Sequence, residues 1–111
     1  MKKPAQREVK WEIAEGFRDS WRAFVKIDPD IKKKMADFNR CKRANPQQQL
    51  PGKMRDHKLD GPLAGFMECH LAADILLIYK HRPNGVIRLF RVCEHEDLSG
   101  PKGKALAKLL K

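Results

Sequence analysis

Residues 75–94 read ILLIYKHRPNGVIRLFRVCE, and this stretch decides the fold. Its first five residues are a continuous apolar run, which is typical of a strand buried on both faces of a sheet. The dipeptide Asn84-Gly85 follows the run and tolerates the positive φ angles that a tight hairpin turn requires. The chain then returns through residues 86–94. The stretch therefore predicts two antiparallel strands at the centre of a sheet.

The residues before this hairpin predict further strands. Residues 65–72 alternate in character, and the alternation puts Glu68 and His70 on one face of a strand. Residues 57–60 form a short extended segment that Gly61-Pro62 closes. We therefore expect an antiparallel meander of three to four strands, with His70 on a strand rather than in a loop.

The N-terminal part of the chain changes its period twice. Val9, Trp11 and Ile13 alternate with polar residues and predict a short strand. Apolar residues then recur at helical spacing in two blocks, residues 17–25 and 31–41, separated by Asp28-Pro29. An aspartate followed by a proline favours a helix start, because the side chain can cap and proline has no N–H to lose. Asn45-Pro46 is predicted to end the second helix.

The order of these elements predicts an α+β fold, with an N-terminal strand, a two-helix hairpin on one face, and the antiparallel sheet. At 111 residues the chain is expected to form a single domain. Residues 1–7 are interpreted as a loose lead-in. Residues 101–111 form a basic extension, in which residues 104–111 are predicted to be a short helix or a tail.

The charge of the chain favours a polyanionic partner. Twenty-four Lys and Arg against 14 Asp and Glu give a net charge of +10, which attracts nucleic acid. An acidic protein, an anionic membrane or simple solubility are the alternatives. The predicted nucleic-acid-binding residues are the cations of the second helix, which an ordinary solvated face would also explain, and two that follow it: Lys32, Lys33, Lys34, Arg40, Lys42, Arg43, Lys53 and Arg55.

Cysteine spacing and hydropathy indicate the compartment of the protein and whether it binds a metal or a membrane. Cys41, Cys69 and Cys93 are odd in number and match no zinc-site spacing, so we expect free buried thiols in a reducing compartment and no metal. The N-terminus has no apolar segment of the signal-peptide kind, and no window has the length of a membrane span. The expectation is a cytoplasmic protein without a membrane partner.

Several blocks between residues 55 and 100 carry a family resemblance. DHKLDG, GFMECHLAAD, ILLIYK, RLFR and EHEDLSG look like the corresponding blocks of the YafQ branch of the RelE/ParE toxin superfamily. The resemblance implies a RelE-like fold and the toxin of a bacterial type II toxin–antitoxin module. It further implies an endoribonuclease that enters the ribosomal A site, contacts ribosomal RNA, cuts messenger RNA without a metal or other cofactor, and is restrained by a cognate antitoxin.

The resemblance also implies a catalytic set. It places the three family histidines and the aspartate on His57, His70, Asp74 and His95, and the phosphate-contacting arginine on Arg91. Metal-free RNA cleavage needs a base, an acid and a cation near the phosphate, which histidine and arginine supply. We expect His95 to be the acid, either His57 or His70 to be the base, Asp74 to be an orienter or alternative base, and Arg91 to stabilise the transition state.

Simpler interpretations exist for the same residues. His57 alone would be an ordinary surface residue, His70 a satisfied strand histidine, and Asp74 a turn cap. Arg91 and His95 are predicted to share a strand face if the alternation continues to residue 95. His81, in the hairpin, is interpreted as a plain surface residue.

Two positions depart from the family pattern. Ile75 and Ser99 stand where the family often has an aromatic residue, and base stacking on an aromatic contributes about 1–3 kcal/mol. A non-catalytic nucleic-acid-binding or ribosome-binding module on the same scaffold is therefore one alternative function. Gyrase inhibition, as in the ParE branch, is another, although it would not require the histidines.

Overall fold

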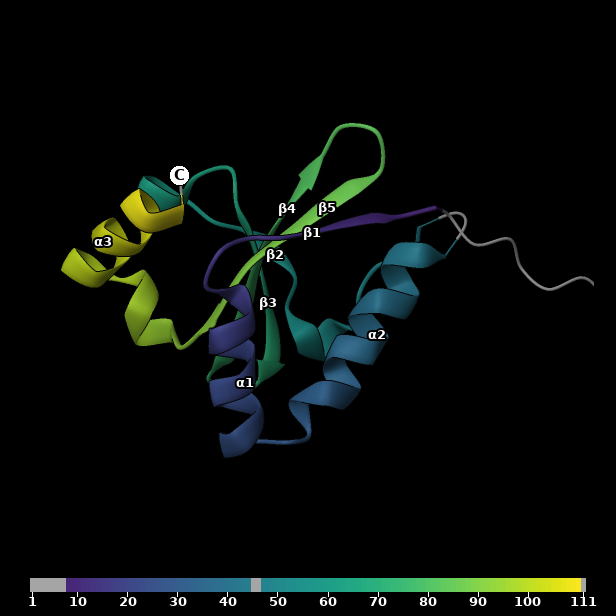
Figure 1. The fold of residues 1–111 in the computed structure, drawn as a ribbon, viewed down its shortest axis with the longest axis horizontal. Helices are drawn as coiled ribbons and strands as arrows, with labels where there is room; N and C mark the ends of the chain where they lie inside the picture. Colours follow the sequence, from purple (N-terminus) through teal and green to yellow (C-terminus); the bar gives the residue numbers. More distant parts are fainter. Residues whose placement is uncertain (1–7, 45–46, 111) are drawn as a thin grey trace, which may run out of the picture.

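The computed structural model describes residues 8–44 and 47–110. A five-stranded sheet forms the middle layer, with α1 (Phe17–Ile27) and α2 (Ile31–Arg43) packed on one face and α3 (Gly100–Leu110) on the other (Figure 1). The predicted α+β class and the two-helix hairpin are confirmed. The lead-in and the predicted helix end at Asn45-Pro46 lie outside the described residues.

The sheet has the strand order β1-β5-β4-β3-β2. Its strands are β1 (Lys10–Ile13), β2 (His57–Lys58), β3 (Met67–Ala72), β4 (Ile75–Arg82) and β5 (Val86–Cys93). Strands β2 to β5 form the predicted antiparallel meander, whereas β1 runs parallel to β5, with Trp11 beside Ile87. A parallel partner needs a crossover, which the helical hairpin and strands β2 to β4 supply.

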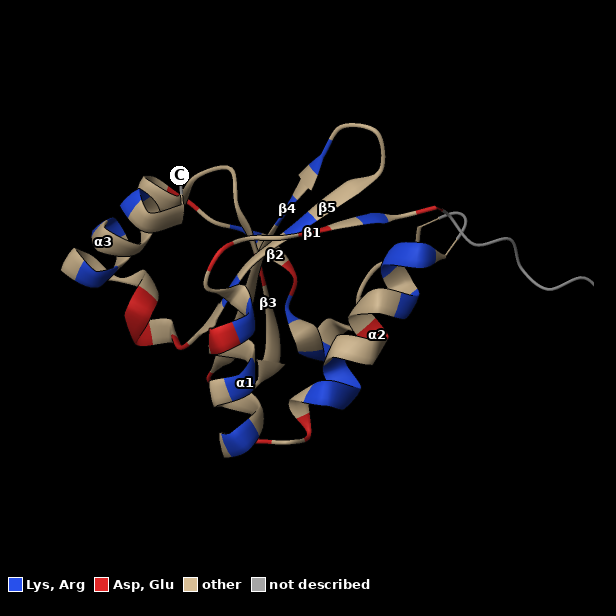
Figure 2. Ribbon diagram, in the orientation of Figure 1, with Lys and Arg blue, Asp and Glu red and all other residues tan. Residues whose placement is uncertain are grey.

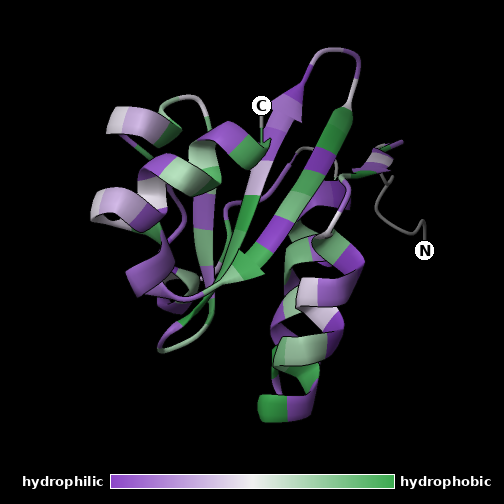
Figure 3. Ribbon diagram, turned by 60° about the vertical axis from the view of Figure 1, so that its left-hand side comes forward, coloured by the Kyte–Doolittle hydropathy of each residue, from purple (hydrophilic) through white to green (hydrophobic). Residues whose placement is uncertain are grey.

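The apolar run of β4 is buried on both faces, as its composition predicts. Leu77 and Tyr79 point into a core shared with α1 and α2, whereas Leu76 and Ile78 point into a second core under α3. All four side chains have essentially no exposed surface. The strands through the middle of the molecule accordingly carry much of the hydrophobic colour in Figure 3. Strand β4 therefore fixes both layers at once.

Strand β5 does not keep the simple alternation that the sequence suggests. Ile78 pairs with Arg91 and Tyr79 pairs with Leu89, so Phe90 is an extra residue in a β-bulge. The bulge moves Arg91 to the α3 face, opposite to Leu89. The strand also ends at Cys93, and His95 begins the 3₁₀ helix η3 (His95–Leu98). The prediction that His95 extends the strand face is wrong, because a turn of 3₁₀ helix follows the strand instead.

Helix α3 is longer than the predicted segment 104–111, since it begins at Gly100. Leu106, Ala107 and Leu110 are buried against the second core, which includes Phe66 and Phe90. Docking on the sheet explains how a short helix persists, because helices of this length are marginal in isolation. Within residues 8–44 and 47–110, no helix is long and apolar enough to cross a membrane.

Candidate active site

Three histidines converge on one buried carboxyl group, that of Glu68 on β3. His70 Nε2 lies 3.3 Å from Glu68 Oε1, and His95 Nε2 lies 3.8 Å from the same oxygen. His57 Nε2 lies 3.6 Å from Glu68 Oε2. The predicted histidines therefore come together, although they belong to β2, β3 and η3.

Strand pairing explains this convergence. His57 on β2 pairs with Glu68, so the two side chains share a face, and His70 lies two residues further along the same strand. The rings of His70 and His95 meet edge to face, with centroids 5.0 Å apart. The side chains of His57 and His95 are 52% and 53% exposed, whereas His70 is only 7% exposed. A substrate can therefore reach His57 and His95 more directly than His70.

Asp74 orients His95 from the β3–β4 turn. Asp74 Oδ1 accepts a hydrogen bond from the backbone N–H of His95 at 3.2 Å and lies 3.2 Å from its ring Nδ1. The backbone N–H of His95, helped by the ring, holds the pKa of Asp74 below its ordinary value. A carboxylate on Nδ1 leaves Nε2 of His95 to face Glu68 and any substrate.

The backbone carbonyl of Arg55 orients His57 in the same way. His57 Nδ1 lies 2.7 Å from Arg55 O, and a carbonyl only accepts, so Nδ1 carries the proton. Arg55 has a φ of 48°, which is uncommon for a residue other than glycine, and this turn brings its carbonyl back to the ring. The Nε2 atoms of both exposed histidines are therefore directed at Glu68.

Burial lowers the pKa of His70 below its ordinary value. The charges of His95, Arg55 and His57 lower the pKa of His70 further, and Glu68 opposes them. A buried imidazole with a lowered pKa is neutral at neutral pH. His70 thus contributes a neutral ring to the cluster.

This shift predicts a pH dependence of stability. The folded state binds the proton of His70 less well than the unfolded state, so the unfolding free energy should fall as pH drops below about 6.5. The contribution of the neutral His70 ring to the unfolding free energy is complete above that pH. It is lost as the pH falls towards the lower pKa of His70 in the folded state. Urea unfolding of wild type and His70→Gln between about pH 5 and pH 8 measures it. An unchanged slope in His70→Gln would contradict the assignment.

Arg91 lies on the same sheet face but points elsewhere. Arg91 pairs with Ile78, and Ile78 pairs with Glu68, so the three residues stand side by side across β5, β4 and β3. The guanidinium lies against Gly16, where an added Cβ would be 2.7 Å from Arg91 Nη2. Its Nε is buried without a hydrogen-bond partner among the described residues. The structure thus places Arg91 near the cluster, with its charge directed at the start of α1.

Glu68 is the site residue that the sequence interpretation missed. The alternation of residues 65–72 already put Glu68 on the face of His70, and a charged residue within an otherwise apolar strand was the available signal. Glu68 is 3% exposed, and its Oε1 has no hydrogen bond of good geometry among the described residues. Burying a carboxyl group in such surroundings costs folding free energy. Groups of this kind are concentrated at functional sites.

The cations of α2 are divided by the fold. Lys32, Lys33 and Arg40 are exposed, and Figure 2 shows several blue Lys and Arg segments along α2. Lys42 is only 2% exposed, with Nζ 4.8 Å from the Tyr79 ring centre and 3.1 Å from His81 Nε2. The prediction that Lys42 lies on the outer face is wrong, because its position turns inward with the apolar stripe.

Several neighbouring predictions also need adjustment. Arg43 is half-buried against Trp11, with the guanidinium carbon 5.9 Å from the ring centre. His81 is exposed, but it is more than a plain surface residue because it contacts Lys42 and lies edge-on to Tyr79. Lys34 is partly covered, and Lys53 and Arg55 are exposed. The free cationic surface of α2 is therefore smaller than the sequence suggests.

The two positions that depart from the family pattern differ in the structure. Ile75 is buried in the core that α1 and α2 cover, so it offers no surface for stacking. Ser99 is exposed, and its hydroxyl donates to the carbonyl of Glu96 at 3.3 Å.

The three cysteines are buried and free, as expected, and burial raises the pKa of Cys93 to about 12.

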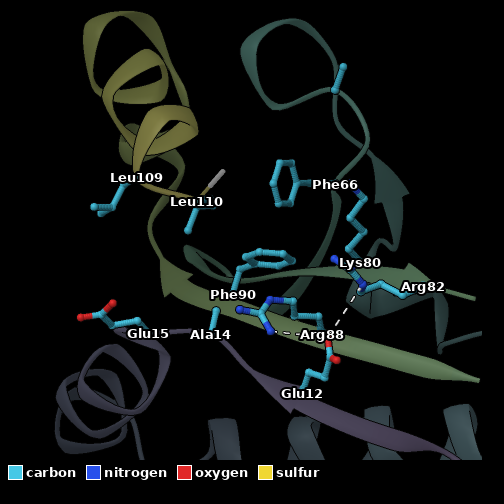
Figure 4. A pocket seen from close by; sticks show the side chains of 11 residues that line it. Glu12, Ala14, Glu15, Phe66, Lys80, Arg82, Arg88, Phe90, Leu109 and Leu110 are labelled. Carbon is cyan, nitrogen blue, oxygen red and sulfur yellow. Dashed lines mark hydrogen bonds and ion pairs between the residues drawn. The ribbon is translucent and has the colours of Figure 1, made fainter.

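A separate pocket of about 680 Å³ opens beside α3 (Figure 4). Lys80, Arg82 and Arg88 line it above the rings of Phe66 and Phe90. Both arginines share one carboxylate, since Glu12 Oε1 lies 3.8 Å from Arg82 and 3.4 Å from Arg88. None of the predicted catalytic residues lines this pocket. It is therefore distinct from the histidine cluster.

The cluster also has the composition of a metal site. One ligand atom each from Glu68, His70 and His95 lies within 4.8 Å of the others. Two imidazole nitrogens and one carboxylate oxygen suit zinc or copper. The residues thus fit a transition metal, although the sequence interpretation expected none.

Solved structures similar to this chain share its fold. They include the metal-bound toxin from Helicobacter pylori, at 29% identity and a TM-score of 0.68 over 83% of this chain and 100% of that one. The DinJ–YafQ toxin–antitoxin complex from E. coli matches at 26% identity and a TM-score of 0.63, over 86% and 99%. A YoeB/ParE toxin from Agrobacterium tumefaciens matches at 16% identity and a TM-score of 0.61, over 78% and 99%, and shows the fold alone. No curated protein sequence matches the chain.

These likenesses define the class as a toxin of the RelE/ParE fold. The model of one family, described as the bacterial toxin of the type II toxin–antitoxin system, YafQ, matches residues 9–100. The chain therefore belongs to the YafQ toxin family, and the resemblance between residues 55 and 100 is confirmed.

Proposed function

We propose that this toxin is a messenger-RNA endoribonuclease that acts on the ribosome. A 2′-hydroxyl attacks the adjacent phosphate, its proton goes to a base, and the departing 5′ oxygen receives a proton from an acid. The products are a 2′,3′-cyclic phosphate and a 5′-hydroxyl. The supporting observation is the pair of half-exposed histidines, His57 and His95, whose Nε2 atoms flank the Glu68 carboxyl group.

The geometry favours particular roles for these residues. His95 is the acid, because the Asp74 carboxylate accepts a hydrogen bond from Nδ1–H and so directs Nε2 towards the substrate as the proton donor. His57 is the base, because its Nδ1–H is held by Arg55 O and its Nε2 can accept a proton. His70 is too buried to meet the 2′-hydroxyl directly and holds Glu68 and His95 in place.

Two arginines are available to stabilise the phosphate. Arg91 shares the sheet face of Glu68 and reaches the phosphate by rotating away from Gly16. The charge of Arg55 already acts on His70. We expect Arg91→Ala to lower cleavage by about 100-fold, as for other groups that stabilise developing negative charge. Arg91→Lys should restore little, because a lysine lacks the planar fork. Single-turnover rates of these variants beside Arg55→Ala show which cation is used.

The partners follow from the family. The described complex of an E. coli relative pairs it with the antitoxin DinJ, and we infer a cognate antitoxin for this chain. An acidic segment of that antitoxin would bind the exposed cations Lys32, Lys33 and Arg40. Binding there would block docking on ribosomal RNA. Co-purification of ribosomes without any small acidic protein would count against this partner.

Induction of the chain in a bacterium tests the function. The nuclease proposal expects growth arrest with messenger RNA cut inside coding regions, and relief of both by His95→Ala. Arrest with intact messenger RNA and DNA damage would indicate gyrase inhibition. Ribosome binding without cleavage would indicate the non-catalytic module. A ribosome-bound assay on defined codons then gives the sequence preference.

Metal ions should inhibit the reaction. A relative from Helicobacter pylori is described as metal-bound, and Glu68, His70 and His95 offer the ligand atoms here. A bound Zn²⁺ or Cu²⁺ would occupy Nε2 of His95, the nitrogen that must donate the proton. Titration of Zn²⁺ into the cleavage assay should abolish activity, and a chelator should restore it. Loss of activity on adding the chelator to the enzyme as purified, at a free Mg²⁺ concentration that keeps the ribosome intact, would overturn the metal-independent mechanism.

A further inference from the structure

Helix α3 lies outside the region that the family shares. The family model ends at residue 100, where α3 begins. The two relatives above 25% identity are matched over 99–100% of their length by 83–86% of this chain. Helix α3 is therefore an addition to the family domain.

Helix α3 contacts η3, the short helix that begins with His95. The backbone of Gly103 lies against that of Leu98, so that an added Cβ would be 2.4 Å from the Leu98 carbonyl oxygen. The Gly103 N–H donates to Ser99 O at 3.2 Å, and the Lys102 ammonium pairs with the Glu96 carboxylate. A backbone contact this close is possible only for glycine.

The other side of α3 is fixed to the sheet. Leu106, Ala107 and Leu110 are buried in the second core, and Leu98 of η3 packs against the same core. Figure 4 shows Leu110 directed from α3 towards the ring of Phe90. The sheet, α3 and η3 thus form one packed unit, in which η3 contacts both α3 and the second core.

A helix of four residues has little stability of its own. Within residues 94–97, a reciprocal pair of hydrogen bonds between Glu94 and Asp97 caps η3, and Asp74 binds the first N–H. These contacts hold only the first turn of η3. A proton donor misplaced by about 1 Å can cost about 100-fold in rate, so its support has functional weight.

We propose that α3 is a positioning element for the reaction. Through the contact of Gly103 with Leu98, α3 sets the place of η3 and so holds the His95 ring between Asp74 and Glu68. The catalytic part of this inference rests on the nuclease function proposed above. The placement of His95 by α3 is a structural statement that can be tested without a substrate.

The test is Gly103→Ala in the full chain. Alanine favours a helix more than glycine does, so α3 itself should persist while its new methyl group pushes η3 away. We expect kcat to fall by about 10–100-fold with little change in KM. The ring and backbone NMR resonances of His95 should shift, and its amide should exchange faster. Gly52→Ala is the matched control, because an added Cβ there meets nothing within 4 Å.

The outcomes separate the two proposals. A shifted His95 resonance in Gly103→Ala, with no cleavage by the wild type, would support the positioning role and refute the nuclease. Unchanged His95 resonances and unchanged kcat in a folded Gly103→Ala would overturn the positioning role. If Gly103→Ala does not fold, Leu106→Ala replaces it, because this change loosens α3 on the sheet. Wild-type exchange of the His95 amide in Leu106→Ala would then overturn the positioning role.

Discussion

His95→Ala should lower the single-turnover rate of ribosome-bound cleavage by about 10²–10⁴-fold, the usual contribution of a positioned acid or base. The leaving 5′ oxygen would then have to take its proton from water. The His95 side chain is 53% exposed, and it contacts the buried Glu68 only at 3.8 Å, so the melting temperature should stay close to that of the wild type. His81→Ala, which removes an exposed histidine outside the cluster, should keep the full rate.

The dependence of the rate on pH distinguishes an acid from a residue that only binds RNA. An acid must be protonated, so the wild-type rate should decline at high pH, and His95→Ala should lose this decline. Asp74→Asn removes the carboxylate that orients the His95 ring, so the rate should fall while the decline at high pH remains. If His95→Ala raises KM at an unchanged kcat and keeps the decline, His95 binds the substrate and the acid is another group.

Local sequence signals were sufficient for most of the fold. The residues 75–79 run, the Asn84-Gly85 turn and the two helical stripes depend on spacing within one segment, and each formed as expected. The direction of β1 relative to β5 depends on contacts across the whole chain, so periodicity alone could not give it. The same is true of α3, whose length is set by packing against Phe66 and Phe90.

The site was predictable in its composition but not in its geometry. The family resemblance pointed to three histidines and Asp74, and the structure brings them together. The resemblance did not reveal the bulge at Phe90, which moves Arg91 to the face of Glu68. A single inserted residue does not change the composition of a mainly apolar strand, so the sequence gives no signal for it. The resemblance also did not reveal Glu68, whose importance comes from contacts with His57 and His95 on other elements.

Glu68→Leu should stabilise the fold while abolishing most cleavage. The carboxyl group is 3% exposed and receives only long contacts from three histidines, so it remains poorly compensated for its loss of water. Burying a polar group without a compensating hydrogen bond costs about 1–3 kcal/mol, and Glu68→Leu removes this cost. The unfolding free energy from urea titration should therefore rise. Cleavage should fall by about 100-fold, because misplaced catalytic groups cost on that order.

Glu68→Gln separates the charge of this residue from its shape. The amide keeps the volume and can still hydrogen-bond, but it is uncharged, so Nε2–H of His95 faces a weaker acceptor than a carboxylate. We expect the loss of activity to persist in Glu68→Gln with a smaller gain in stability than in Glu68→Leu. A drop in unfolding free energy for Glu68→Leu would mean that the carboxyl group holds the fold together through the histidines. Strained functional groups usually cost stability and provide activity, so removing them makes the protein more stable and less active. We expect this trade-off at Glu68.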